Sequence, residues 1–158
     1  MPFSMPPDAQ LAGFTLRTND LEAMAGWYEE ALGFSSTRTD EGARLSLDGS
    51  LVTIDLLNDP SAPSRPYPCV GLYHFALLLP SRPALGGILE HLIERETGFE
   101  GFADHGVSEA IYLRDPDYNG IELYRDRPRN EWPRLGDGTL AMMSDPLDTR
   151  GIVNESNG

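Results

Sequence analysis

Alternating apolar and polar residues predict a strand near the start of the chain. In the stretch LAGFTLRT the apolar residues alternate with Thr15 and Arg17, which is the pattern of a strand with one buried face. Apolar residues then recur at helical spacing as far as Gly33, a residue suited to the left-handed position at a helix C-terminus. Asn19 is expected to cap the start of this helix. Three short strands should follow, over residues 34–39, 43–47 and 51–57.

The same order of elements returns in the second half of the chain. The proline-rich segment 59–69 is unsuited to regular structure and is predicted to be a linker. After it come a strand over residues 71–79 and a helix that Ser81 caps. Three further strands are expected over residues 101–103, 110–114 and 120–125.

This repeat predicts an α+β fold built from two βαβββ modules. We place the modules at residues 11–58 and 70–127, within one domain of residues 11–135. Each module leaves one face of its sheet uncovered, so the modules are expected to pair into one curved mixed sheet around a cavity. Residues 1–10 should be a flexible lead-in, and the Asp-, Gly- and Ser-rich residues 136–158 a partly disordered tail.

Overlaying the two modules pairs four polar residues of the strands. Thr15 falls on His74, and Asp55 falls on Glu122. Each of the four lies between apolar neighbours, so its side chain should point away from the core. All four are therefore expected to face one concave pocket.

Composition and charge narrow the range of functions. The 25 acidic and 12 basic residues give a formal net charge of −13, which repels the phosphates of nucleic acids and anionic membrane surfaces. No apolar run reaches the length of a membrane helix, and the N-terminus lacks the basic and apolar regions of a secretion signal. We therefore expect a cytoplasmic protein that binds neither nucleic acid nor membrane. The single cysteine, Cys69, argues against a disulfide framework or a thiolate metal cluster.

Four strings of residues add a family resemblance to this plan. GLYHFALLLPSR, DHGVSEAIYLRDP, NGIELYRDRP and EWPR resemble the N-terminal half of bacterial catechol 2,3-dioxygenases of the two-domain type. Those enzymes belong to the vicinal oxygen chelate superfamily, together with glyoxalases, bleomycin-resistance proteins and other extradiol ring-cleaving dioxygenases. The likeness runs from Leu11 to Asp145. It implies the glyoxalase/dioxygenase fold and an oxidoreductase of aromatic compound catabolism.

The resemblance also implies a metal site and the residues that form it. In the family, two histidines and one carboxylate hold Fe2+ or Mn2+ and leave positions open for a catecholate and dioxygen. His74 matches the second of these histidines, and Glu122 matches the carboxylate. His105 and Tyr112 lie where the family has a histidine and a tyrosine that act on the bound ligand, so the resemblance implies that they are catalytic.

The chain departs from the family pattern at the first histidine. Thr15 stands there, and a hydroxyl is a poor substitute for an imidazole at an iron(II) site. Asp55 could supply a replacement ligand, in a harder set that suits Mn, Mg or Ca. Thr15 and Arg17 are then expected to line the substrate pocket. Tyr118 stands where the family usually has Gly, in the turn before Glu122.

Three functions follow from these residues. The first is an extradiol ring-cleavage-related protein with a depleted metal site. The second is a metal-free binding module of the bleomycin-resistance type. The third is a glyoxalase-type isomerase or lyase, which requires Asp55 as a metal ligand. In each case the expected partner is a small aromatic or planar molecule, and the resemblance allows a homodimer.

Overall fold

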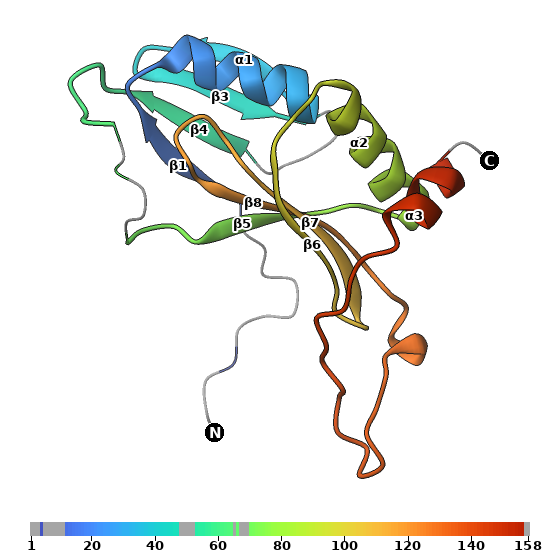
Figure 1. Ribbon diagram of the computed structural model, residues 1–158. Coiled ribbons are helices and arrows are strands. Elements are labelled where there is room, and N and C mark those ends of the chain that lie inside the picture. The colour runs from blue at the N-terminus through green and yellow to red at the C-terminus, as the bar shows by residue number, and fades with distance from the viewer. Residues whose placement is uncertain (1–3, 5–11, 48–52, 65, 67–69, 157–158) are drawn as a thin grey trace. The chain divides into compact units, whose positions relative to one another are not determined.

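Each half of the chain forms a mixed sheet with its own helix in the computed structural model (Figure 1). The structure describes residues 4, 12–47, 53–64, 66 and 70–156. The chain divides into two compact units, unit 1 comprising residues 1–64 and unit 2 comprising residues 65–158.

Unit 1 is a four-stranded sheet with one helix. Its elements are β1 (Gly13–Thr18), α1 (Leu21–Leu32), β2 (Ser35–Thr39), β3 (Gly42–Ser46) and β4 (Thr53–Asn58). The strand order is β1-β4-β3-β2, with β1 parallel to β4 and the other pairs antiparallel. The apolar faces predicted from the sequence form its core, which includes the buried residues Met24, Tyr28, Leu45, Ile54 and Leu56.

The ends of α1 show which local signals set the helix boundaries. Asp20, and not the predicted Asn19, caps the start, because its carboxylate accepts a hydrogen bond from the Ala23 N–H at 3.0 Å. Asn19 instead donates its side-chain amide to the Ala62 main-chain oxygen at 3.0 Å. Gly33 ends the helix with φ 71, the left-handed conformation expected of a C-terminal glycine.

Unit 2 repeats the order and topology of unit 1. Its elements are β5 (His74–Leu78), α2 (Arg82–Glu94), β6 (Phe99–Asp104), β7 (Ser108–Arg114) and β8 (Gly120–Asp126). The strand order is β5-β8-β7-β6, with β5 parallel to β8 and the other pairs antiparallel. Ser81 caps α2 as predicted, accepting from the Ala84 N–H at 3.2 Å. The double βαβββ order and the α+β class are therefore confirmed, as two four-stranded sheets.

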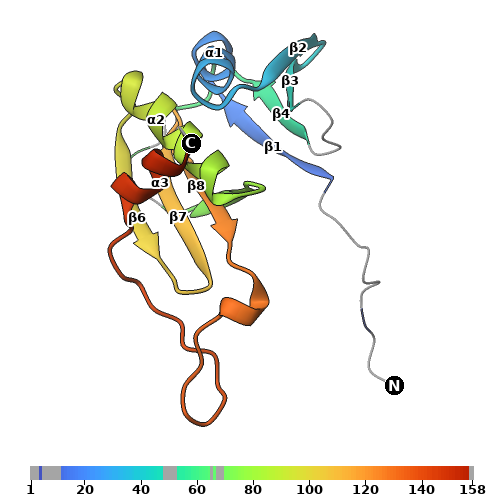
Figure 2. The ribbon, with the colours of Figure 1, turned by 90° about the vertical axis from the view of Figure 1, so that its right-hand side faces the viewer.

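The described C-terminal residues, 128–156, are part of unit 2. Residues 129–131 form a 3-10 turn, and residues 149–156 form the helix α3 (Thr149–Ser156). Both ribbon views show α3 beside α2 (Figures 1 and 2). Gly86 permits this contact, because a Cβ at that position would lie 2.2 Å from the Ile152 main-chain oxygen. The glycine that weakens α2 as a helix is thus the place where α3 docks.

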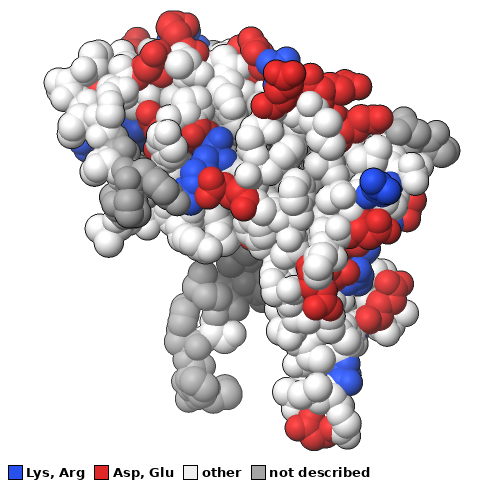
Figure 3. Space-filling model, in the orientation of Figure 1, with Lys and Arg blue, Asp and Glu red and all other residues white. Residues whose placement is uncertain are grey.

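Acidic side chains are spread over the surface. Figure 3 shows Asp and Glu in red across the face in view, with Lys and Arg in blue beside some of them, as the net charge of −13 leads one to expect. No helix among the described residues is long and apolar enough to cross a membrane.

Candidate functional site

One face of the unit 2 sheet carries the candidate site. His74 on β5 pairs with Gly120, and the next row on that face holds Ala76, Glu122 and Tyr112. Side chains of paired residues point the same way, and alternate residues of a strand share a face. His74, Glu122 and Tyr112 therefore lie on one side of the sheet.

Four side chains of unit 2 form a continuous chain of polar contacts. The Tyr112 hydroxyl donates to Glu122 Oε1 at 3.0 Å, and Glu122 Oε2 lies 3.0 Å from His74 Nε2. The Tyr112 oxygen also lies 3.0 Å from His105 Nε2, and His105 Nδ1 lies 2.9 Å from the Met143 main-chain oxygen. The structure thus brings together the four site residues expected in this half of the chain.

The hydrogen atoms available to these polar contacts allow one proton to pass along them. A carbonyl oxygen can only accept, so His105 Nδ1 carries a hydrogen that it donates to Met143. The phenol has a single hydrogen, which it gives to Glu122 or to His105 Nε2. While Glu122 receives it, the contact with His105 is a hydrogen bond only if Nε2 is also protonated. One proton can therefore pass between His105 and Glu122 through the Tyr112 hydroxyl.

Tyr112 itself stays neutral across the physiological range. Burial, followed by the negative charge of Glu122, raises the pKa of Tyr112 to about 12. Its hydroxyl therefore remains a donor while it relays a proton. Glu122 is well enclosed, with 15% of its side chain exposed, and 30% of the His74 side chain is exposed.

A hollow of about 250 Å³ opens beside these residues. Its walls include the rings of Tyr73, His74 and Tyr112, with centroids 4.8 Å apart for the first two and 5.9 Å for the last two. Gly101 and Gly120 also line it and add no side chains. A Cβ on Gly120 would lie 2.0 Å from the Tyr73 main-chain oxygen, so only glycine fits there. The hollow is therefore walled by aromatic rings, with open space above the backbone at Gly101.

A charged pair lines another part of the hollow. Arg114 Nε lies 2.9 Å from Glu100 Oε2, and Arg114 Nη1 donates to the Tyr118 main-chain oxygen at 2.9 Å. Tyr118 has φ 61, the left-handed region that favours glycine, at the position where the resemblance led us to expect one. The buried Asp115 carboxylate holds this turn by accepting from the Asn119 N–H at 2.8 Å.

His74 and Glu122 fit two positions of a divalent metal site. Metal–ligand distances of about 2.1 Å at right angles put neighbouring ligand atoms about 3 Å apart. The observed 3.0 Å between His74 Nε2 and Glu122 Oε2 matches that spacing. Within the described residues, however, no group of three or more His, Cys, Asp or Glu side chains is arranged to hold a metal ion. The pair fits a metal, but as an incomplete set of ligands.

The site residues expected in the first half lie in unit 1. Thr15 on β1 and Asp55 on β4 are paired neighbours, and both line a hollow of about 380 Å³ together with Arg44. Arg44 donates to both Asp55 oxygens, at 2.7 and 3.2 Å, and this hydrogen bonding holds the pKa of Asp55 below its usual value. Arg17 is largely exposed and lies 3.7 Å from Asp59. Both Asp55 carboxylate oxygens therefore already accept hydrogen bonds from Arg44.

Strand register contradicts the expected overlay of the two halves. In unit 1 Thr15 pairs with Asp55, whereas in unit 2 Glu122 pairs with Ala76, two residues beyond His74. Overlaying Asp55 on Glu122 therefore brings Thr15 onto Ala76. The pattern of the sequence could not reveal this, because a shift of two residues preserves every inward and outward assignment in a strand.

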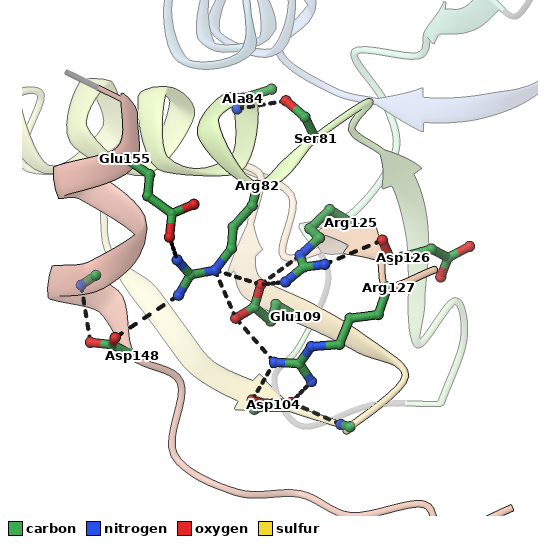
Figure 4. Close-up of polar contacts among 12 residues, drawn as sticks. Ser81, Arg82, Ala84, Asp104, Glu109, Arg125, Asp126, Arg127, Asp148 and Glu155 are labelled. Carbon is green, nitrogen blue, oxygen red and sulfur yellow. Dashed lines mark hydrogen bonds and ion pairs between the residues drawn. The ribbon is translucent and has the colours of Figure 1, made fainter. Parts of the chain in front are cut away.

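A buried charge cluster on the other face of the unit 2 sheet was not foreseen from the sequence. Glu109 is 2% exposed, and Figure 4 shows Arg82, Arg125 and Arg127 converging on its carboxylate. The contacts are 3.0 Å from Arg82 Nε, 2.6 Å from Arg125 Nε and 3.3 Å from Arg127 Nη2. Arg127 also binds both oxygens of Asp104, which holds the pKa of that carboxyl below its usual value. Three cations thus offset the cost of burying one carboxylate.

Comparisons with known proteins agree with the fold and with the resemblance. A model of the Glyoxalase/Bleomycin resistance protein/Dioxygenase superfamily matches residues 10–123. The chain is 42% identical over 155 residues to a catechol-2,3-dioxygenase of Bacillus subtilis (strain 168), which covers 97% of this chain and 54% of that protein. It is 34% identical over 123 residues to a biphenyl-2,3-diol 1,2-dioxygenase 3 of Rhodococcus globerulus, which covers 74% of this chain and 63% of that protein. The chain thus spans less than two thirds of either relative.

Solved structures share the fold at low sequence identity. A glyoxalase/dioxygenase from Nostoc punctiforme matches with a TM-score of 0.63 and 18% identity, covering 81% of this chain and 99% of the other. A lactoylglutathione lyase from Agrobacterium tumefaciens matches with a TM-score of 0.60 and 18% identity, covering 76% of this chain and 96% of the other. These similarities concern the fold alone.

Proposed function

The chain belongs to the glyoxalase/bleomycin resistance protein/dioxygenase superfamily, and from this membership we propose that it is an extradiol-dioxygenase-type protein that binds a catechol-like ligand beside His74 and Glu122. The observation that carries the proposal is the series of polar contacts from His105 through Tyr112 and Glu122 to His74, in which Tyr112 and His74 line the aromatic hollow. It joins two metal-binding groups to a proton path in one place. The metal site is proposed to be depleted in ligands.

The walls of the hollow suit a small planar ring. Tyr73 is 81% exposed and lies against His74, so one face of its ring is available for stacking. At Gly101 a Cβ would meet nothing within 4 Å, so the bare backbone there leaves room for a ligand to lie against the sheet. An aromatic diol could thus place its ring near Tyr73 and its oxygens near Glu122 and Tyr112.

His74 Nε2 and Glu122 Oε2 are the atoms that would hold Fe2+ or Mn2+. When bound, such an ion supplies a Lewis acid and a template for the two oxygens of a vicinal diol. His74 would then present a lone pair to the metal, in place of a hydrogen bond to Glu122. The Tyr112 hydroxyl would donate its hydrogen to a ligand oxygen in place of Glu122, and His105 Nε2, once it is protonated, would return a proton to the Tyr112 oxygen.

The test is a metal titration of the chelator-stripped protein under anaerobic conditions, with and without catechol. We expect one Fe2+ or Mn2+ per chain, bound more tightly with catechol and lost in His74→Ala and Glu122→Ala. His91→Ala, which changes a histidine of α2 away from the hollow, is the matched control and should bind as the wild type does. Absence of binding up to millimolar metal overturns the metal-dependent function.

A metal-free binding module is the second candidate, and one observation favours it. Asp55, the proposed substitute ligand, is held by two hydrogen bonds from Arg44. The same contact weighs against a glyoxalase-type isomerase or lyase, which requires Asp55 on the metal. Catechol binding that persists in excess chelator, and is weakened by Tyr73→Ala, would identify the metal-free module.

A further inference from the structure

We propose that the C-terminal strap, defined as residues 128–148, is a positioning element that fixes the tautomer of His105 and so presents Nε2 of that ring to Tyr112. The tautomer itself is independent of the function proposed above. Only the exchange of a proton between His105 Nε2 and Tyr112 during the reaction rests on that function. Met143 and the residues around it thereby acquire a role that their side chains do not reveal.

The strap pairs with the residues that carry His105. The Asp145 N–H donates to the Asp104 oxygen at 2.9 Å, and the Asp104 N–H donates to the Asp145 oxygen at 2.8 Å. Two residues earlier, Met143 meets His105 twice. Its N–H donates to the His105 main-chain oxygen at 3.4 Å, and its carbonyl receives the His105 Nδ1 hydrogen at 2.9 Å. The His105 imidazole is thus hydrogen-bonded to the backbone of Met143, which also pairs with the His105 backbone.

Gly106 lets the strap pass close over the turn. A Cβ at Gly106 would lie 2.8 Å from Pro133 Cγ and 3.0 Å from Met143 Cε. Gly106 is buried and has φ 76, so the position requires glycine for its conformation as well as for its space. Its N–H donates to Asp104 Oδ1 at 2.8 Å, which closes the turn around His105.

The charge cluster holds the same turn from its other side. Arg127 donates to both Asp104 oxygens, at 2.5 and 2.8 Å, and reaches Glu109 as well (Figure 4). The Trp132 ring nitrogen in the strap donates to the Arg127 main-chain oxygen at 2.8 Å. Asp104 is therefore fixed through its carboxylate by Arg127 and through its backbone by Asp145.

The chemical consequence is specific to a carbonyl partner. A neutral imidazole carries one hydrogen, and the hydrogen bonds that the ring makes decide which nitrogen holds it. Because the Met143 oxygen only accepts, it selects the hydrogen on Nδ1 and leaves the Nε2 lone pair facing Tyr112. Without this contact, a share of the His105 rings would lack the Nε2 lone pair that faces the Tyr112 hydroxyl.

The tautomer can be read by NMR of the full chain labelled with ¹⁵N in its histidine side chains. The chain has three histidines, so His74→Gln and His91→Gln assign the remaining signals. When the ring carries a single hydrogen, we expect His105 to be protonated on Nδ1 alone. Protonation on Nε2, or a near-equal mixture, overturns the proposal. This measurement needs neither metal nor catechol, so its outcome is distinct from failure of the proposed function.

Two glycine variants test the strap itself. Gly106→Ala presses on Pro133 and Met143, and we expect the tautomer preference of His105 to move toward an equal mixture. Gly138→Ala is the matched control: Gly138 lies within the strap at φ 85, but a Cβ there meets nothing within 4 Å, so the preference should remain. If His105 shows the same tautomer preference in Gly106→Ala as in Gly138→Ala, the role of the strap is overturned. If Gly106→Ala does not fold, Met143→Gly loosens the same contact without added bulk and should shift the preference in the same direction.

Discussion

Glu122 accepts the Tyr112 hydrogen through one oxygen and faces His74 through the other, so its charge is felt by both. Burial and that charge, in this order, raise the pKa of Tyr112 to about 12. Glu122→Gln should therefore lower the pKa of Tyr112 but leave it above the ordinary value of about 10, because the ring stays buried. Ultraviolet titration of phenolate, with Tyr112→Phe to identify the signal, measures both values.

The direction of the stability effect follows from the raised pKa. Tyr112 holds its proton more tightly in the folded chain, so its contribution is complete below a pH of about 10 and is lost as the pH rises to about 12. The stability difference between wild type and Tyr112→Phe should therefore shrink across that range in urea unfolding. An unchanged pKa of Tyr112 in Glu122→Gln would contradict the assigned electrostatic coupling.

The sequence predicted only those site residues whose side chains carry a signature. Strand alternation predicted that the side chains of His74, Glu122 and Asp55 point away from the core. The family resemblance added His105 and Tyr112 to the candidate site residues. Alternation could not foresee that Arg44 engages Asp55, because the pairing of strands decides which polar residues become neighbours. Nor does any side-chain pattern indicate that the Met143 carbonyl binds His105, because every residue has a carbonyl.

Among the elements, α3 is the one that composition did not foresee. Its Asp-, Gly- and Ser-rich surroundings predicted partial disorder, but Ile152 is fully buried and α3 packs against α2. Arg82 of α2 also forms ion pairs with Asp148 and Glu155 (Figure 4). Local propensity is a weak predictor for an eight-residue helix, since most of its stability comes from tertiary contacts.

The adjacent glycines of α2 offer a matched test of that contact. Gly87→Ala should stabilise the chain by about 0.5–1 kcal/mol, because alanine is the better helix former and a Cβ there meets nothing within 4 Å. Gly86→Ala should instead destabilise it, because the Cβ would lie 2.2 Å from the Ile152 oxygen and α3 would have to move. Urea unfolding measures both free energies. A gain in both variants would mean that α3 is not held against Gly86.

For the whole molecule, the formal charge of −13 attracts divalent cations to many carboxylates, so metal binding alone does not identify a site. Raising the salt from about 0.01 M to about 0.1 M shortens the Debye length from about 30 Å to about 10 Å and screens this diffuse attraction. Binding at the His74–Glu122 pair should be weakened but retained, because ligand atoms in direct contact with the metal are screened much less. A His74→Ala, Glu122→Ala double variant should bind metal only at the lower salt concentration and lose this binding at the higher one.

Free Mn2+, measured by electron paramagnetic resonance during titration at both salt concentrations, separates the two kinds of binding. The wild type should keep one Mn2+ per chain at the higher salt, and the double variant none. If both proteins lose Mn2+ alike, the acidic surface accounts for all of the binding, and the 3.0 Å contact between His74 and Glu122 is a hydrogen bond within a metal-free ligand site. The charge of the whole chain therefore sets the salt concentration at which the metal-dependent and metal-free functions can be told apart.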